Sequence, residues 1–292
     1  MGIEILKFMI YSVLIVLISK YILVTTLRKL AENLNMKPKT VGNVAGIATS
    51  VPELLTVGVS SFNGLIGASV VNILSSNIIN LIQYLTSIYL NKNKKAFQNK
   101  AIQIDLILVA ITIVIPIVFI SLDIEINILT VPAFIITYIL FRFINNNVHK
   151  LHLKKEDEIL ENQIKEEEKW ERGNKNKTFR YVVILLFTGI LLFIVGNALG
   201  STLENLCNKF NIPQFIVGML LGFITSIPEL ITFFESQKHY KNKKVDDILG
   251  VVEATNNLLT SNILNLFIIQ SVGVIIFALM HWHESNKMIN WW

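Results

Sequence analysis

Thr49-Ser50-Val51-Pro52-Glu53-Leu54 lies inside an apolar run long enough to cross a bilayer, and it returns as Thr225-Ser226-Ile227-Pro228-Glu229-Leu230 inside a second such run. Each copy places a carboxylate beside a proline at a depth where lipid favours neither residue. An acidic residue at the centre of a spanning helix costs roughly 2.5–3.5 kcal/mol on insertion scales. Because this cost recurs in the same local sequence, we infer that the two glutamates have a function.

The composition is that of a polytopic membrane protein. Of the 292 residues, 52% are hydrophobic and 16% are charged, whereas a soluble domain has about 25% charged residues. We therefore expect an all-α polytopic membrane protein with about eight transmembrane helices. The apolar runs of spanning length are roughly 6–27, 40–61, 64–90, 102–121, 126–145, 179–200, 213–235 and 248–280.

The basic residues predict the topology. Of the 26 Lys and Arg residues, 22 fall in four loops on one side of the apolar runs: 28–39, 91–100, 142–180 and 236–247. The positive-inside rule places these loops in the cytoplasm and the N-terminus outside, in a protein integral to the cell membrane. The net charge of +5 is therefore a topology signal and does not indicate nucleic-acid binding. The single cysteine, Cys207, excludes a disulfide framework and a thiolate metal site.

The two copies belong to an internal duplication. Six of eight positions recur between 49–56 and 225–232, and five of six recur between 76–81 and 261–266. Because the copies lie an odd number of spans apart, the second copy crosses the membrane in the opposite direction. This predicts two inverted repeats, of five and three spans, an architecture typical of transporters with ligand sites near mid-membrane.

The duplication also predicts the domain organisation. We expect a first membrane repeat, a charged cytoplasmic linker and a second membrane repeat. Their bounds are 1–145, with a repeated core at 38–82; 146–178; and 179–292, with a repeated core at 213–267.

Oxygen-bearing side chains surround each carboxylate in the sequence. Thr49 and Ser50 stand four and three positions before Glu53, on one helix face, and Thr225 and Ser226 stand likewise before Glu229. The next helices carry matching polar stripes, Asn72, Ser76 and Asn80 in one and Asn257, Ser261 and Asn265 in the other. Carboxylate, hydroxyl and amide oxygens form a hard shell that suits calcium and sodium better than zinc or copper.

Each of these features has a structural alternative. A membrane proline is usually a kink, an Asn or Ser stripe usually makes interhelical hydrogen bonds, and a lone Glu usually forms a salt bridge. The four runs that hold the motifs contain no Lys, Arg or His. Two buried carboxylates without a fixed cation must be protonated or bind a mobile cation, which favours an ion site.

The paired motifs resemble the two alpha-repeats of the sodium/calcium exchanger family, in the cation/calcium antiporter superfamily, over about 28–82 and 200–267. The resemblance implies that Glu53 and Glu229 hold calcium and that the first and sixth helices slide past the core to alternate access. It also implies eight further residues in the calcium and sodium sites: Thr49, Ser50, Ser76, Asn80, Thr225, Ser226, Ser261 and Asn265.

The chain departs from the family pattern in its glycines and its length. Gly46 and Gly222 stand where the family usually has Ala. Larger residues replace glycines of the pattern at Ala48, Val71, Ser75, Ile224, Asn256 and Thr260. We expect these replacements to narrow the room for close backbone approach. The family has two more spans after the point where this chain ends; a trimmed natural form, a homodimer that covers the exposed face and an incomplete chain are all open.

The function expected is calcium exchange for sodium by alternating access, without a cofactor and with calcium and sodium as substrates. We expect it to be indifferent to potassium, because Asn265 stands where potassium-dependent members usually have Asp. The alternatives are a calcium/proton or other divalent-cation exchanger and a degenerate, non-transporting membrane protein of the same fold. An enzyme is not expected, because no nucleophile–base pair or metal triad is visible in the sequence.

Overall fold

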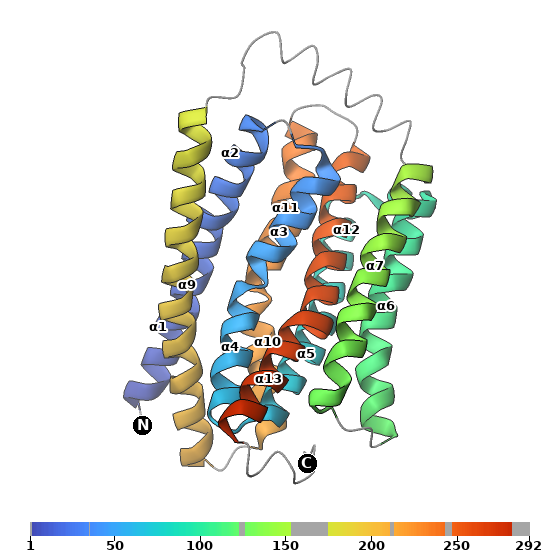
Figure 1. Ribbon diagram of the computed structural model, residues 1–292. Helices are drawn as coiled ribbons and strands as arrows, with labels where there is room; N and C mark the ends of the chain where they lie inside the picture. Colours follow the sequence, from blue (N-terminus) through green and yellow to red (C-terminus); the bar gives the residue numbers. More distant parts are fainter. Residues whose placement is uncertain are drawn as a thin grey trace.

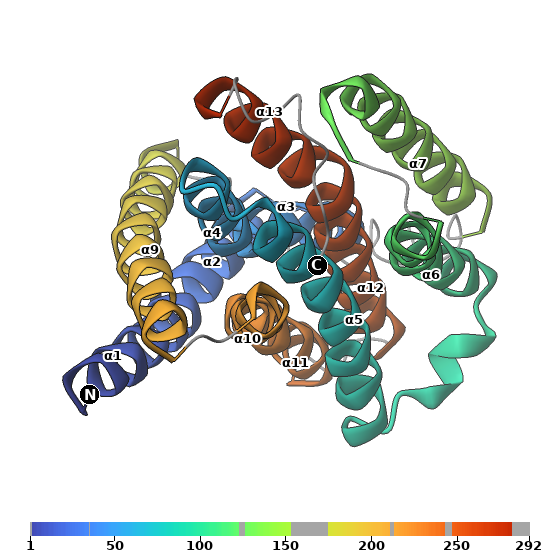
Figure 2. The ribbon, with the colours of Figure 1, turned by 90° about the horizontal axis from the view of Figure 1, so that it is seen from below.

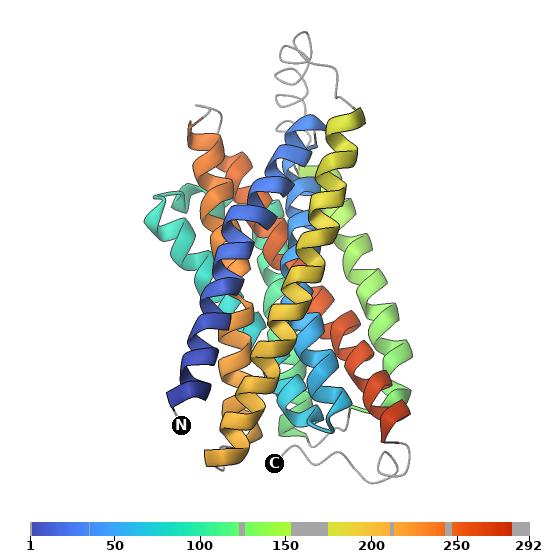
Figure 3. The same cartoon turned by 90° about the vertical axis from the view of Figure 1, so that its left-hand side faces the viewer.

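The computed structural model of the protein describes residues 2–34, 36–122, 126–152, 175–210, 213–242 and 247–281. Helices make up this part of the chain, and they run side by side (Figures 1 and 3). Eight helical segments are long and apolar enough to cross a membrane: Ile3–Ala31, Pro38–Phe62, Ile66–Leu90, Lys100–Phe119, Ile128–Val148, Asn176–Thr202, Gly218–Asn242 and Ile248–Met280. The prediction of an all-α polytopic protein is confirmed.

The first five spans are built from these elements: α1 (Gly2–Ile18), η1 (Ser19–Val24), α2 (Thr25–Asn33), α3 (Pro38–Thr49), α4 (Val51–Phe62), α5 (Ile66–Leu90), η2 (Lys94–Gln98), α6 (Lys100–Ser121), η3 (Ile128–Thr130) and α7 (Val131–His152). The last three are built from α9 (Lys175–Phe210), α10 (Gln214–Thr225), α11 (Ile227–Asn242), α12 (Asp247–Ile263), η4 (Leu264–Ile269) and α13 (Gln270–Met280). Of these, η1 and η4 are π-helical.

The two motif spans run in opposite directions. In Figure 1 the chain descends through α3 and α4 but rises through α10 and α11. The end of α7 and the start of α9, which the 153–174 segment joins, lie at the upper end, and the N-terminus lies at the lower end. We call the upper end the linker side. The prediction of inverted repeats is confirmed.

Both motif spans are broken at a serine. Ser50 ends α3 with φ −81° and ψ 1°, and Ser226 ends α10 with φ −81° and ψ 0°. Each following half-helix has a proline in its first turn, where a missing N–H is tolerated. Glu53 and Glu229 therefore lie in the first turns of α4 and α11, where the helix dipole favours a negative charge.

The four motif spans form the core of the molecule. In an apolar 18-residue stretch of each of these spans, between 50 and 61% is buried, against 22–33% in the corresponding stretch of each of the other four spans. In Figure 2 the core lies between a pair formed by α1–α2 and α9 on one side and a pair formed by α6 and α7 on the other. The first span and α9 are thus a peripheral layer on the core.

Glycines of α3, in the first repeat, allow close packing against α12 of the second repeat. A Cβ atom added at Gly42 would lie 3.0 Å from Asn256 Cβ, and one at Gly46 would lie 2.9 Å from Thr260 Cβ. The larger residues of α12 therefore fit because the facing helix has no side chain at these points.

The second repeat packs in the same way, with glycines of α10 facing α5. A Cβ atom added at Gly218 would lie 2.7 Å from Val71 Cβ, and one at Gly222 would meet Ser75 Oγ. The expectation that the larger residues at Val71, Ser75, Asn256 and Thr260 narrow the helix approach is therefore wrong. The glycine has moved to the facing helix, so the close approach is kept.

Membrane orientation gives the first testable prediction. We expect an impermeant thiol reagent to label Cys207 in intact cells and to leave Asn174→Cys, made in a Cys207→Ser background, unlabelled until the membrane is permeabilised. The positive-inside asymmetry is the reason. The Cys207 side chain and the linker residues 153–174 lie outside the described residues, and the domain bounds stay a prediction. Labelling of Asn174→Cys from outside would reverse the topology.

Candidate functional site

The ten residues predicted for the site converge in the core. Each is at most 1% exposed, and they come from both repeats: Thr49, Ser50, Glu53, Ser76, Asn80, Thr225, Ser226, Glu229, Ser261 and Asn265. Two broken helices bring the carboxylates and hydroxyls to mid-span, and α5, α12 and η4 cross beside them. All ten side chains are polar, so each buried polar group needs a hydrogen-bond partner or a bound ion.

Ser261 links the carboxylate of Glu229 to residues of the first repeat. Ser261 donates to Glu229 Oε1 at 3.1 Å, and the Ser50 hydroxyl donates to Ser261 Oγ at 3.0 Å. Asn80 Nδ2 donates to the same Ser261 oxygen at 3.4 Å. The Thr49 hydroxyl is also a neighbour of Glu229, although it donates to the Ala45 carbonyl at 2.9 Å.

Glu53 stands in the equivalent position of the other repeat, but fewer hydrogen-bond donors surround it. Its neighbours include Thr225 and the Glu229 carboxylate, so the two carboxylates lie close enough to repel each other when both are charged. The Thr225 hydroxyl donates to the Leu221 carbonyl at 2.9 Å rather than to Glu53. Both carboxylate oxygens of Glu53 are buried without a hydrogen-bond donor.

Two asparagines that the sequence reasoning left out of the site hold the repeats together. Asn77 Nδ2 donates to the Asn262 carbonyl at 3.2 Å, and Asn262 Nδ2 donates to the Asn77 carbonyl at 3.2 Å. Their Oδ1 atoms accept from Asn265 and Asn80, both at 3.3 Å. Both stand in the repeated Ser-Asn-Ile sequence, which could have pointed to them.

Two further amides lie beside the half-helices. Asn72 donates to Thr56 Oγ1 at 2.8 Å, and Asn257 donates to Thr232 Oγ1. Their donor groups are thereby used, and their Oδ1 oxygens remain free to accept.

The core contains a set of buried acceptors without donors. Around the two glutamates these are Oε1 and Oε2 of Glu53, Oε2 of Glu229, and Oδ1 of Asn72, Asn80, Asn257 and Asn265. Elsewhere in the described chain, side-chain oxygens of Gln83, Asn145 and Gln270 are also buried without a donor. An unpaired buried acceptor costs free energy, and a cation is a partner that satisfies several oxygens at once. The Ser226 hydroxyl is also buried there without a partner.

The described part of the chain places no Lys, Arg or His in an ion pair with either site carboxylate. The salt-bridge alternative therefore does not account for Glu53 and Glu229. Two arginines from outside the motif spans do reach into the core, which the sequence reasoning missed. Arg28 pairs with Glu253, and Arg142 donates to Asn43 Oδ1 and Thr260 Oγ1, both at 3.1 Å.

The acceptor set is also unlike a resident transition-metal centre. In the part of the chain that the structure describes, no group of three or more His, Cys, Asp and Glu residues lies in reach of one ion. Two carboxylates with amides and hydroxyls remain, a donor set for hard cations.

Comparison with known proteins agrees with this chemistry. The family model for "Sodium/calcium exchanger protein" matches residues 5–145 and 180–291. Nothing among curated protein sequences matched the chain significantly.

Solved structures of transporters share the fold. The sodium-calcium exchanger NCX_Mj soaked with 100 mM Na⁺ and 10 mM Sr²⁺ has a TM-score of 0.58 at 21% identity, over 94% of this chain and 83% of that one. The same exchanger with 2.5 mM Na⁺ and 0.1 mM Ca²⁺ has a TM-score of 0.55 at 22% identity, over 94 and 82% of the two chains. The H⁺/Ca²⁺ exchanger CAX has a TM-score of 0.64 at 12% identity, over 96 and 69%.

Proposed function

Because this chain belongs to the sodium/calcium exchanger family, we propose that it exchanges calcium for sodium across a membrane, with Glu53 and Glu229 as ion ligands. The observation that supports this most is the set of unpaired oxygens at the crossing of the two repeats. Two carboxylates match the charge of one calcium ion, and amide and hydroxyl oxygens extend the shell toward the six to eight oxygens that calcium takes.

The half-helices give a reason for the position of the ligands. Each glutamate stands in the first turn after a helix break, near the middle of its span. Because the repeats are inverted, exchanging the conformations of the two halves turns a site open to one side into a site open to the other. This exchange is the alternating access that an antiporter needs.

Calcium/proton exchange is the second candidate, and the proximity of the two carboxylates favours it. Neighbouring buried carboxylates without a fixed counter-charge can be neutralised by protons as well as by metal ions. Sodium is favoured by the hydroxyls and amides around the carboxylates, since these oxygens coordinate a metal ion and are not needed for proton binding.

The degenerate alternative drew on the replaced glycines and on the shorter second half. The first ground is weakened at four of the six replaced positions, because Gly42, Gly46, Gly218 and Gly222 keep the core helices in close contact from the facing side. The buried glutamate of each repeat argues against this alternative.

The choice of counter-ion is tested with purified protein in vesicles. We expect calcium uptake into sodium-loaded vesicles at fixed pH, with the same rate whether potassium is present or absent, because the core supplies amides at Asn80 and Asn265 instead of further carboxylates. Vesicles without a sodium gradient are the control. A strict need for potassium would contradict the assignment of Asn265, and uptake that follows the pH gradient alone would select the proton exchanger.

A further inference from the structure

A buried ion pair joins the first span to the core. Arg28 of α2 donates to both carboxylate oxygens of Glu253 in α12, Nη1 to Oε2 at 2.7 Å and Nη2 to Oε1 at 2.6 Å. The side chains are only 17% and 4% exposed. A bidentate geometry of this kind is the strongest form of an arginine–carboxylate contact. It connects a peripheral span to a core helix near the linker side.

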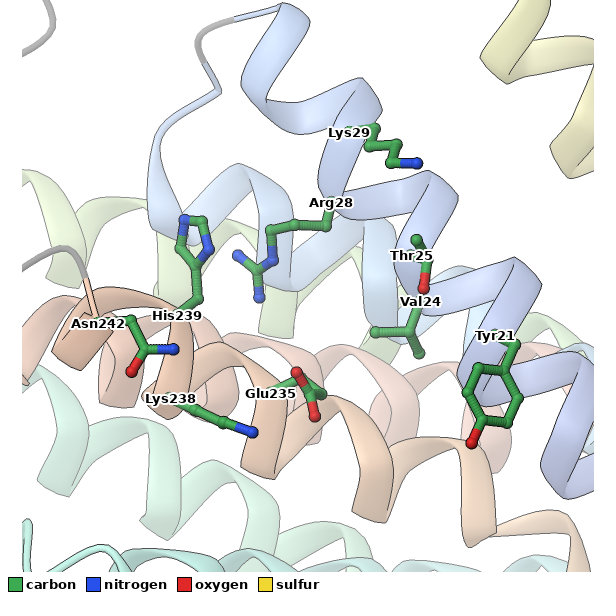
Figure 4. Close-up of a pocket in the computed structure, with 9 residues that line it drawn as sticks. All are labelled: Tyr21, Val24, Thr25, Arg28, Lys29, Glu235, Lys238, His239 and Asn242. Atoms are coloured by element: carbon green, nitrogen blue, oxygen red, sulfur yellow. The ribbon is translucent and has the colours of Figure 1, made fainter.

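The arginine of the pair borders a cavity of about 470 Å³ between the first span and α11. In Figure 4, Arg28 extends from α2 toward α11, while Lys29 beside it extends away. Apolar atoms form most of its surface, and the charged or polar ends of Arg28, Glu235 and Asn242 are among the groups that line it. The residues that line it are Tyr21, Val24, Thr25, Arg28, Lys29, Glu235, Lys238, His239 and Asn242.

The contact between the first span and the core is apolar beside this cavity. Leu23 and Leu27 of the first span and Ala45 of α3 are at most 6% exposed and belong to one buried cluster. Ala45 stands one turn before Thr49 of the site, whose hydroxyl bonds the Ala45 carbonyl. In this structure these packed side chains therefore lie between the linker side and the site.

The inverted repeat has no matching pair at the opposite side. A Cβ atom at Gly42 would meet the Glu253 carbonyl, and one at its counterpart Gly218 would lie 2.7 Å from the Ala68 carbonyl, so Ala68 is the counterpart of Glu253. The block Glu32-Asn33-Leu34 recurs as Glu204-Asn205-Leu206, which makes Gly200 the counterpart of Arg28. Ala68 and Gly200 have no charges with which to form such a bridge.

We propose that the Arg28–Glu253 pair is a one-sided latch that holds the first span on the core at the linker side and favours the state in which the site opens to the other side. This inference rests on the alternating access proposed above. A bond present in only one of two inverted halves lowers the free energy of one end state and not of the other, so it shifts the balance between them. The cavity beside Arg28 gives the guanidinium a place to move when the first span leaves the core.

The test uses two cysteine reporters at equivalent places in the two repeats. Ala45→Cys reports opening at the linker side and Leu221→Cys reports opening at the other side, because each residue stands four before a site threonine that bonds its carbonyl at 2.9 Å. Each reporter is made in a Cys207→Ser background, and the rate of thiol labelling is measured on purified protein in nanodiscs without calcium.

We expect Arg28→Met and Glu253→Gln each to raise the labelling rate of Ala45→Cys by about tenfold and to lower that of Leu221→Cys. Arg28→Met leaves the Glu253 carboxylate, which a proton can neutralise, and Glu253→Gln leaves the charged Arg28 guanidinium, which lines the cavity. Because the two variants leave different groups behind, the same shift in both comes from loss of the pair. The double variant Arg28→Glu with Glu253→Arg restores the pair and should return both rates toward those of the parent. Lys29→Gln is the matched control, because it removes a charge from the same cavity without touching Glu253.

The latch is overturned if both reporters keep their labelling rates in the single variants, if both rise together, or if the reversed pair fails to restore them. Labelling does not require transport, so this result is separate from the ion assignment. Calcium binding to the single variants, measured by calorimetry, should persist, whereas loss of binding in Glu53→Gln concerns the site alone.

Discussion

Replacing Glu53 or Glu229 with glutamine is expected to abolish calcium uptake while the protein still inserts and folds. Each glutamate supplies one of the two negative charges that match a calcium ion, and neither is offset by an ion pair among the described residues. Loss of a residue that merely supports a metal ligand costs about 10–100-fold in affinity, so loss of a ligand charge should cost more. Insertion should become easier, because an amide is cheaper in the membrane than a carboxylate.

Calcium flux in vesicles and calorimetric calcium binding check this result, and thermal unfolding in detergent shows whether each variant is folded. Glu235→Gln is the matched control: it lies on the same helix as Glu229, one and a half turns further on, and lines the linker-side cavity instead of the site. Normal uptake by Glu53→Gln or Glu229→Gln would remove that residue from the site.

A large loss of stability is expected from a single added methyl group at Gly218. An alanine Cβ there would lie 2.7 Å from both the Ala68 carbonyl and Val71 Cβ, so α10 and α5 must separate. Overpacking of this kind costs about 1–3 kcal/mol in the free energy of unfolding. The measurement is the melting temperature of purified Gly218→Ala in detergent.

Gly189→Ala is its control, because nothing lies within 4 Å of the added carbon in α9. That variant should keep or slightly raise the melting temperature, as an alanine in a helix is favoured over glycine by about 0.5–1 kcal/mol. Combining Gly218→Ala with Val71→Gly should cost less than the sum of the two single changes. Equal melting temperatures for Gly218→Ala and Gly189→Ala would contradict the packing.

The fold could be predicted from the sequence because lipid imposes simple rules. Backbone groups in the membrane must be satisfied within a helix, so each apolar run of sufficient length is a span. The repeated Thr-Ser-x-Pro-Glu motif also indicated the burial of both carboxylates in the membrane core, and the helix breaks at Ser50 and Ser226 lie within this motif. These features depend on residues that are close together in the sequence, so a short stretch of sequence is enough to predict them.

Contacts between distant helices could not be predicted in the same way. Arg28 and Glu253 lie 225 residues apart, and neither has a spacing or a motif that points to the other. The prediction that replaced glycines narrow the helix approach was wrong for a related reason. A motif is read along one helix, but the room between two helices depends on both, and Gly42 compensates for Asn256 only across the interface.

The charge of the core determines how membrane voltage acts on the exchanger. With both carboxylates ionised and no ion pair to them among the described residues, the proposed site would have a formal charge of −2 when it is empty. One calcium ion or two monovalent ions neutralise it, so an exchange of one for the other moves no net charge and generates no current. A third monovalent ion would carry one elementary charge across the membrane, worth about 2.3 kcal/mol per 100 mV. An electrical recording of this protein would therefore count the monovalent ions exchanged for each calcium.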